Sequence, residues 1–198
     1  MFKKILTLVL VLVTVFFTVS VFSSCRSAPV PEPLPVEEPP PIQEPPPPPI
    51  PEPPPCRELP PFEPNAFERR VFELVNRERL IHRLEPLIWH ESAAFVAREH
   101  SIDMHDNDFM RHTGSDGSNV RQRLENVCIK NIASLSAGIA GGWLTPEEVV
   151  EAWMDSPIYR QNILRRDFTH TGVGYFQRPP DSNSRFATYW TQNFFVFE

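Results

Sequence analysis

The sequence predicts an α+β fold, in which a small antiparallel sheet is covered by helices. Apolar residues recur at helical spacing in segments between residues 65 and 164, and alternating segments follow between residues 171 and 197. Capping residues stand before several of the helical segments and indicate where those helices begin. Because the helical segments precede the strands instead of alternating with them, the pattern favours an α+β class over a parallel α/β sheet.

The first helix is expected from Asn65 to about Leu80. Asn65 is a preferred N-cap residue, and Glu68 three positions later completes a capping box. A second helix is expected over residues 91–106, after the break at residues 85–86. One narrow face of this second helix carries mainly small side chains, which permit close packing against a neighbouring element. The side chains on that face are Ala94, Ala97, Ser101 and Met104.

Three shorter helices are expected further along the chain. Val120 and Leu124 stand one helical turn apart after the glycine-bearing loop of residues 113–118. Residues 145–148 combine an N-cap threonine, a first-turn proline and a glutamate at the third position, which is a strong helix start. Residues 156–164 begin with Ser-Pro and are expected to form the last helix.

Two strands are expected over Thr171–Gln177 and Arg185–Phe197, with the turn-rich residues 178–184 between them. The second of these segments has the period of two that a strand requires. Phe186, Thr188 and Trp190 alternate with Ala187, Tyr189 and Thr191. The two strands should pair as an antiparallel hairpin.

The N-terminal residues 1–24 are interpreted as a lipoprotein-type signal peptide. Lys3 and Lys4 precede a long apolar run, and small residues stand directly before Cys25. This order resembles a bacterial lipobox, so Cys25 is expected to carry a lipid that anchors the chain to a membrane. The domain would then lie on the extracytoplasmic side of the bacterial cell envelope. The alternative is an uncleaved membrane-spanning helix, because the apolar run approaches the roughly 20 residues that a span needs.

Residues 25–64 are interpreted as an extended spacer. Nineteen of the 24 prolines lie between Pro29 and Pro64, so this segment lacks the amide donors and the apolar side chains that a fold requires. Polyproline II conformation is expected there. The alternative is a ligand for a proline-recognising domain. Residues 65–198 remain, and they suffice for one domain with one core.

Cys56 and Cys128 remain once Cys25 is assigned to the lipid. Thiols of an exported chain tend to pair, so a disulfide between these two cysteines is a candidate, and two free thiols are the alternative. A Cys-His enzyme would require Cys128 to be free.

The charge pattern excludes nucleic acid as a partner. The formal net charge is −6, and the spacer contains several glutamates but no basic residue between Arg26 and Arg57. Arginines of the first helix are interleaved with glutamates, which is typical of a solvated helix face and not of a phosphate-binding track.

Short sequence blocks occur in order along residues 71–192. They are Val71–Asn76, Pro86–Trp89, His100–Met104, Phe109–Thr113, Thr145–Met154, Asn162–Leu164, Asp167–Thr169, Gly172–Gly174 and Trp190–Gln192. In this set the domain resembles the CAP superfamily of cysteine-rich secretory proteins, antigen 5 and pathogenesis-related proteins, in its bacterial secreted form. The resemblance implies a three-layer α-β-α sandwich.

Members of that family have a central cleft in which two histidines and two glutamates can bind a divalent metal. The resemblance places His112 at the first histidine, Ala137 at the first glutamate and Ser156 at the second glutamate. Tyr159 stands where bacterial members commonly have a histidine, and Tyr189 falls at about the second histidine of the final strand. One ligand of four is retained, so no cofactor is expected beyond weak residual binding of a divalent metal at His112.

The other candidate residues are interpreted as structural. His82, His90, His100, His105 and His170 show no recurring spacing to carboxylates and are expected at the surface or in packing. The sequence has no Gly-x-Ser-x-Gly motif, and Ser115-Asp116 is explained by turn chemistry. Asp103, Asp106 and Asp108 lack the twelve-residue spacing of a calcium loop and are expected to be solvated acids.

The loss of ligand residues favours a non-catalytic binding module, which would capture a lipid, a peptide or a protein partner in a CAP-like cleft. Enzyme activity is left open. The alternative is a hydrolase or peptidase that uses His112, although no second group is in sight to orient that base. A further alternative is a structural envelope spacer without any ligand.

Overall fold

The computed structural model describes residues 55–198. The expected signal peptide, the lipidation site at Cys25 and most of the spacer lie outside these residues. Within residues 55–198, no helix combines the length and the apolar character needed to cross a membrane.

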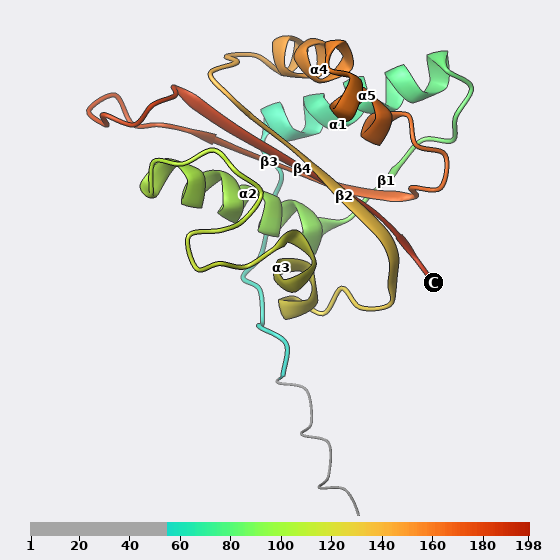
Figure 1. The fold of residues 1–198 in the computed structure, drawn as a ribbon, viewed down its shortest axis with the longest axis horizontal. Helices are drawn as coiled ribbons and strands as arrows, with labels where there is room; N and C mark the ends of the chain where they lie inside the picture. Colours follow the sequence, from blue (N-terminus) through green and yellow to red (C-terminus); the bar gives the residue numbers. More distant parts are fainter. Residues whose placement is uncertain (1–54) are drawn as a thin grey trace, which may run out of the picture. The chain divides into compact units, whose positions relative to one another are not determined.

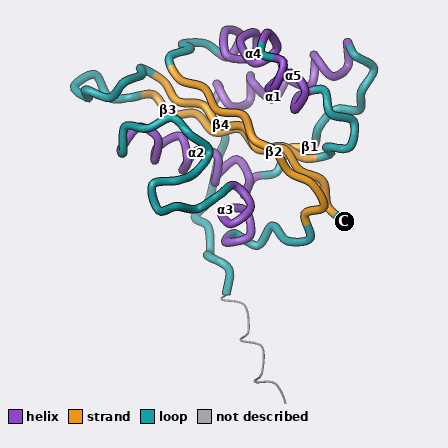
Figure 2. The backbone as a smooth tube through the Cα atoms, viewed as in Figure 1, coloured by secondary structure: helices purple, strands orange, loops and turns teal. Residues whose placement is uncertain are grey.

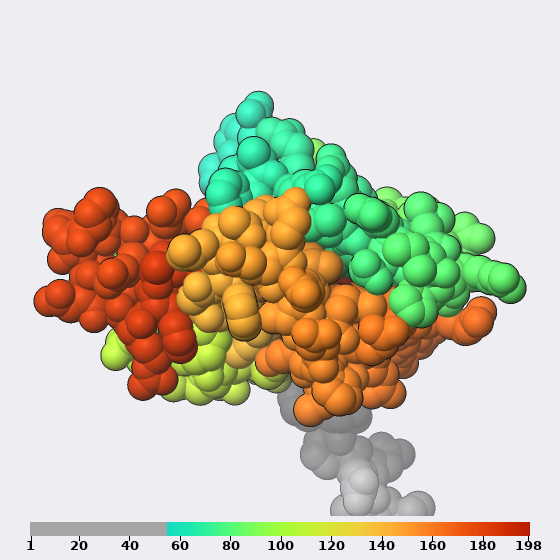
Figure 3. Space-filling view, turned by 90° about the horizontal axis from the view of Figure 1, so that it is seen from above, coloured from blue at the N-terminus to red at the C-terminus, as the bar shows by residue number. Residues whose placement is uncertain are grey.

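Helices cover both faces of a four-stranded sheet, as the expected three-layer sandwich requires (Figure 1). The helices α1, α4 and α5 lie side by side on one face of the sheet (Figure 3), and α2 and α3 lie on the other. The bounds of the helices are Ala66–Ile81 for α1, Glu91–Asp106 for α2, Val120–Asn126 for α3, Pro146–Asp155 for α4 and Pro157–Ile163 for α5.

The sheet has the strand order β1-β3-β4-β2 (Figure 2). The strands are β1 (Ile88–Trp89), β2 (Ile132–Gly141), β3 (His170–Gln177) and β4 (Thr188–Phe197). The expected hairpin of β3 and β4 is present, and β2 pairs antiparallel with β4. The sheet is mixed and not purely antiparallel, because β1 pairs parallel with β3.

Sequence reasoning missed the two edge strands. β1 has only two residues, too few to show a period. β2 has the sequence IASLSAGIAG, in which small residues replace the β-branched and aromatic residues that mark strands. Tertiary pairing with β4 defines β2 as a strand.

The helix starts agree with the sequence. Asn65 and Glu68 form the expected capping box, and the side chain of Thr145 accepts a hydrogen bond from the amide of Glu148 in a second one. α2 has the bounds that were expected from its sequence. β4 begins at Thr188, three residues later than predicted, and the guanidinium of Arg178 donates to carbonyl groups in the preceding loop.

β4 is a central strand, and its residues from Thr188 to Phe195 are buried because helices cover both faces of the sheet. The side-chain amide nitrogens of Gln192 and Asn193 on this strand have hydrogen-bond partners, whereas their side-chain oxygens have none among the described residues. The amide of Gln192 donates to the hydroxyl of Thr171 (3.0 Å), and the amide of Asn193 donates to the carbonyl of Ala93 (3.1 Å). The first bond joins β4 to β3, and the second connects the sheet to α2.

α2 lies unusually close to β3, as its narrow face of small side chains predicted. A Cβ atom added to Gly174 would lie 2.0 Å from the amide nitrogen of Arg98, and one added to Gly172 would lie 2.2 Å from that of Ala94. Only glycine fits where the backbones approach so closely.

Arg79 of α1 is 1% exposed and donates to four backbone carbonyls in two stretches of the chain. Its guanidinium donates to the carbonyl oxygens of Glu85, Ile163 and Arg165, each at 2.8 Å, and to that of Phe168 at 3.1 Å. The expectation that the arginines of this helix are all solvated is therefore wrong for Arg79. Its side chain points inward and binds backbone carbonyls that lie in loops or at a helix end.

The disulfide between Cys56 and Cys128 is present, so the alternative of two free thiols is not supported. The residues after Cys56 pack on the domain although the sequence placed them in the spacer. Leu59 packs against the core between α2 and α3, and Phe62 contacts Phe95 edge to face, with ring centroids 5.8 Å apart. Residues 55–64 therefore lie along α2 as part of the fold.

Candidate functional site

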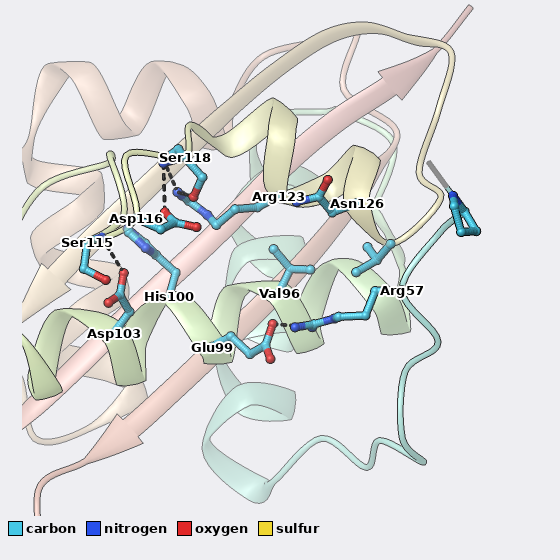
Figure 4. Close-up of a pocket in the computed structure, with 12 residues that line it drawn as sticks. Arg57, Val96, Glu99, His100, Asp103, Ser115, Asp116, Ser118, Arg123 and Asn126 are labelled. Carbon is cyan, nitrogen blue, oxygen red and sulfur yellow. Dashed lines mark hydrogen bonds and ion pairs between the residues drawn. The ribbon is translucent and has the colours of Figure 1, made fainter. Parts of the chain in front are cut away.

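A depression of about 460 Å³ lies between α2, α3 and the loop that joins them. We call it the α2–α3 pocket (Figure 4). It is lined by Pro55, Arg57, Val96, Glu99, His100, Asp103, Ser115, Asp116, Ser118, Arg123, Asn126 and Val127. Its volume falls within the range of small-molecule sites, about 300–1,000 Å³.

The loop that forms one wall of the pocket is fixed by local hydrogen bonds. The carboxylate of Asp103 on α2 accepts from the backbone amide of Ser115 (2.9 Å), which ties the loop to the helix. The carboxylate of Asp116 accepts from the amide of Ser118 (2.8 Å), and Gly117 between them has a φ of 83°, which glycine adopts readily. The loop is thus a defined wall with two carboxylates on it.

Arg123 of α3 brings a partly buried positive charge to the same pocket. Its guanidinium donates to the carbonyl oxygens of Ser118 (2.8 Å) and His112 (2.9 Å). Burial lowers the pKa of Arg123, while the nearby Asp116 and Asp103 raise it. Within residues 55–198, Arg123 forms no direct ion pair, so its charge is available to an anionic group in the pocket.

His100 of α2 is 2% exposed and supplies an acceptor without a partner. Its Nε2 lies 3.0 Å from the carbonyl oxygen of Arg111, which can only accept, so Nε2 carries the proton. Nδ1 is then the acceptor, and it is buried without a hydrogen-bond partner among the described residues. Burial, reinforced by the positive charge of Arg123, lowers the pKa of His100 to about 4, so the ring is neutral at neutral pH.

The outer rim of the pocket is formed by Glu99 and Arg57, which form an ion pair at 2.6 Å. Figure 4 shows this pair on the side of the pocket away from Asp116. Arg57 follows the disulfide-bonded Cys56, so the disulfide helps to hold the rim in place. The pocket therefore offers carboxylates, a neutral imidazole and a cation within one depression.

The residues that the family resemblance assigned to the cleft lie on both sides of the sheet. His112 is exposed in the loop between α2 and α3, where partial desolvation and the charge of Arg123 lower its pKa. Ala137 of β2 packs on the α2 and α3 side, against the core cluster that includes Ala93. Tyr189 is fully buried on the same side and packs with Met104.

Tyr159 and Ser156 lie on the opposite face. Tyr159 of α5 contacts Gly138 and packs with Trp153 under α4, where the remaining gap has no room for a water molecule. Ser156 is the residue between α4 and α5, and its side chain caps neither helix. The structure therefore does not bring the five positions together around one cavity.

These positions do not fit a divalent metal. One imidazole, a methyl group, a hydroxyl, one buried phenol and one partly buried phenol lack the carboxylate and thiolate donors that such an ion prefers. No group of three or more His, Cys, Asp or Glu side chains with metal-binding geometry occurs in the described part of the chain.

The three aspartates at the end of α2 face different partners. Asp103 binds the pocket loop, Asp106 accepts from His105 (2.7 Å), and Asp108 accepts from the amide of Arg185 (3.2 Å). Each carboxylate thus has its own local role, and the three do not converge on one point.

Comparison with known proteins identifies the family. A model of the cysteine-rich secretory protein (CAP) family matches residues 72–194, which is more than half of the chain. The chain belongs to the CAP family. The expectation from the ordered sequence blocks is confirmed.

Two curated proteins of Bacillus subtilis resemble this CAP protein. YkwD, named as uncharacterised, is 37% identical over 130 residues, which are 66% of this chain and 47% of YkwD. YlbC, named as an uncharacterised membrane protein, is 31% identical over 127 residues, which are 64% of this chain and 34% of YlbC. The chain spans less than half the length of either relative.

Two solved structures share the fold. An extracellular protein containing an SCP domain from Bacillus anthracis is 28% identical, with a TM-score of 0.57, over 66% of this chain and 40% of that chain. An outer surface protein from Borrelia burgdorferi, 18% identical with a TM-score of 0.58 over 66% of this chain and 92% of its own, supports the fold alone.

Sequence reasoning missed the α2–α3 pocket. It assigned His100 to packing, Asp103 to solvent and Asp116 to a turn, and each of these roles is partly correct. The sequence did not show that these three residues and Arg123 line the same pocket. The available signal was the Asn119 cap, which with Gln122 forms a capping box that starts α3 and so places Arg123 within this short helix.

Proposed function

We propose that this CAP protein is an envelope-anchored binding module and that the α2–α3 pocket is where its ligand binds. The observation that carries the proposal is the convergence of Asp103, Asp116 and Arg123 on one pocket, beside the buried, neutral His100.

The pocket favours a peptide over the lipid that the family resemblance also allowed. Carboxylates suit an ammonium or hydroxyl group, and the guanidinium of Arg123 suits a carboxylate. A lipid chain would instead have to cover these charged groups, which is unfavourable without hydrogen-bond partners. A short peptide end that carries both a donor and an anion matches the set of groups.

Binding can be tested by NMR titration of the whole chain with short alanine peptides, with either free or capped termini. Peptides with free termini should shift the amide signals of the pocket loop and of Arg123, and Asp116→Asn should weaken the effect at least about 10-fold. Glu147→Gln removes a charge of the same sign from α4 and serves as the control, because Glu147 pairs with Arg70 outside the pocket. Equal responses to free and capped peptides would contradict the assignment.

Membrane anchoring through Cys25 is a second part of the proposal. The order of charged, apolar and small residues before Cys25 supports it, and so does a relative named as a membrane protein. Radiolabelled palmitate should be incorporated by the native chain and lost in Cys25→Ala. Label retained by the variant would exclude Cys25 as the attachment site.

The alternative of a hydrolase that uses His112 gains no support from the geometry. The ring of His112 is exposed, and the only hydrogen bond found for this residue among residues 55–198 is made by its backbone carbonyl. A general base needs a group that orients it, and none is in place here.

A further inference from the structure

A chain of hydrogen bonds links Asp106, His105 and Ser182 at the end of α2 farthest from the disulfide. The carboxylate of Asp106 lies 2.7 Å from Nδ1 of His105, and Nε2 of His105 lies 2.9 Å from Oγ of Ser182. We call this chain the Ser182 relay. Ser182 belongs to the loop that joins β3 and β4, and in Figure 1 this loop lies beside the end of α2.

The direction of each hydrogen bond follows from the chemistry of the partners. A carboxylate only accepts, so Nδ1 of His105 carries the proton and Nε2 is the acceptor. The hydroxyl of Ser182 therefore donates to Nε2. Consistently, Oγ of Ser182 accepts from the backbone amide of Ser184 (3.3 Å). The tautomer of His105 is thus the one in which the imidazole can take a proton from the serine.

The His105 imidazole and the loop that carries Ser182 are held in place by the fold, whereas the Asp106 side chain is 58% exposed. The His105 side chain is 11% exposed and lies between Phe176 and Tyr189, with ring centroids at 4.8 and 5.8 Å. The loop is held by Arg178, whose guanidinium donates to the carbonyl of Ser182 at 2.8 Å. The positions of the His105 imidazole and of the Ser182 hydroxyl are therefore each fixed by other contacts as well as by the hydrogen bond between them.

A depression of about 420 Å³ lies next to the relay and gives a substrate access to it. It is lined by His105, Asp106, Asp108, Ser182, Asn183 and Ser184. The lining is polar, which disfavours long acyl chains, and it contains two carboxylates, which repel anions. The acyl compound that fits is short, and its alcohol part is neutral or positively charged.

We propose that the Ser182 relay is a hydrolytic site for short-chain acyl esters, with Ser182 as nucleophile, His105 as general base and acid, and Asp106 as the positioning residue. This site is separate from the α2–α3 pocket and does not rest on ligand binding there. A serine hydroxyl is activated when it donates a hydrogen bond to a base and that base donates one to an orienting group.

In the first step, Oγ of Ser182 attacks the ester carbonyl carbon while its proton moves to Nε2 of His105. The tetrahedral intermediate then breaks its bond to the alcohol oxygen, and the alcohol leaves with the proton from Nε2, so an acyl-serine remains. Water attacks the acyl-serine in the second step and gives a proton to Nε2. The carboxylic acid is released when Ser182 regains that proton, and each step conserves protons and electrons.

The test uses the whole chain with 4-nitrophenyl acetate, and peptide mapping locates the acetyl adduct. Hydrolysis should fall at least about 100-fold in Ser182→Ala and in His105→Gln, as is typical for loss of acid–base catalysis. The adduct should map to Ser182. Ser92→Ala is the control and should stay within about twofold of the native rate, because Ser92 lies in the first turn of α2, at the opposite end of the helix from the relay, and does not line the depression.

Asp106→Asn separates a catalytic relay from a loop anchor. Without the carboxylate the Nδ1 proton of His105 loses its acceptor, so kcat should fall at least about 10-fold while KM stays within about twofold, and Asp106→Glu should restore part of the rate. A mere loop anchor would leave kcat unchanged. An unchanged kcat in Asp106→Asn, an adduct outside Ser182, or native activity in a folded Ser182→Ala chain would each overturn the proposal.

Discussion

Replacing Arg79 by methionine should destabilise the domain more than any surface substitution. The guanidinium makes four hydrogen bonds to backbone carbonyls from a 1% exposed position. Hydrogen bonds to a charged group contribute about 1.5–3 kcal/mol each, which gives a gross value of about 6–12 kcal/mol. Desolvation of the cation offsets much of this, so the expected net loss in free energy of unfolding is about 4 kcal/mol.

Two further variants make this measurement specific. Arg79→Lys keeps the charge, but its three donors sit on a single nitrogen and cannot reach four separate carbonyls, so about 2 kcal/mol should be lost. Arg77→Met on the exposed face of α1 should change stability by no more than about 0.5 kcal/mol.

The assay is equilibrium unfolding of the whole chain in guanidinium chloride, monitored by tryptophan fluorescence. The slope of the transition should be the same for all variants, so that midpoints report stability alone. A loss below about 1 kcal/mol for Arg79→Met would refute the reasoning, because it would show that the four bonds barely exceed the cost of burying the cation.

Three other perturbations have predicted outcomes in the same assay. Gly174→Ala should cost about 3 kcal/mol or more through its clash with α2, whereas Gly138→Ala, whose Cβ would meet side chains at 3.7 Å, should cost less than about 1 kcal/mol. Replacing Cys56 and Cys128 by serine should cost about 4 kcal/mol, as expected for opening a loop of 72 residues; a loss below about 1 kcal/mol would contradict this. Because the pKa of His100 is about 4 when folded and ordinary when unfolded, the unfolded chain binds its proton first as pH falls. Stability should therefore drop by up to about 3 kcal/mol between pH 7 and pH 4, and His100→Gln should reduce that slope.

The fold could be predicted from the sequence wherever a residue determines the conformation of the few residues that follow it. Asn65 and Thr145 cap their helices through bonds three residues away, so their roles are readable locally. β2 could not be predicted, because its small residues form a strand only through pairing with β4. The position of Arg79 was also unpredictable, since its four acceptors belong to segments up to 89 residues away.

The candidate sites were harder to predict for the same physical reason. The α2–α3 pocket joins His100 to Arg123, and the Ser182 relay joins His105 to a loop 77 residues away. Neither pair has a fixed spacing that a motif could encode. Family resemblance directed attention to His112 and Tyr159 instead, and the structure places those two residues on opposite faces of the sheet.

The position of the disulfide determines how the domain would respond to a mechanical pull on its N-terminal chain. Tension transmitted along that chain reaches the fold at Cys56 and crosses directly to Cys128, two residues after the end of α3. Residues 57–64 then carry no load, and their contacts with α2 are kept. In a reducing medium the same force would fall on the Arg57–Glu99 pair and on Leu59, so the rim of the α2–α3 pocket would be the first part to detach.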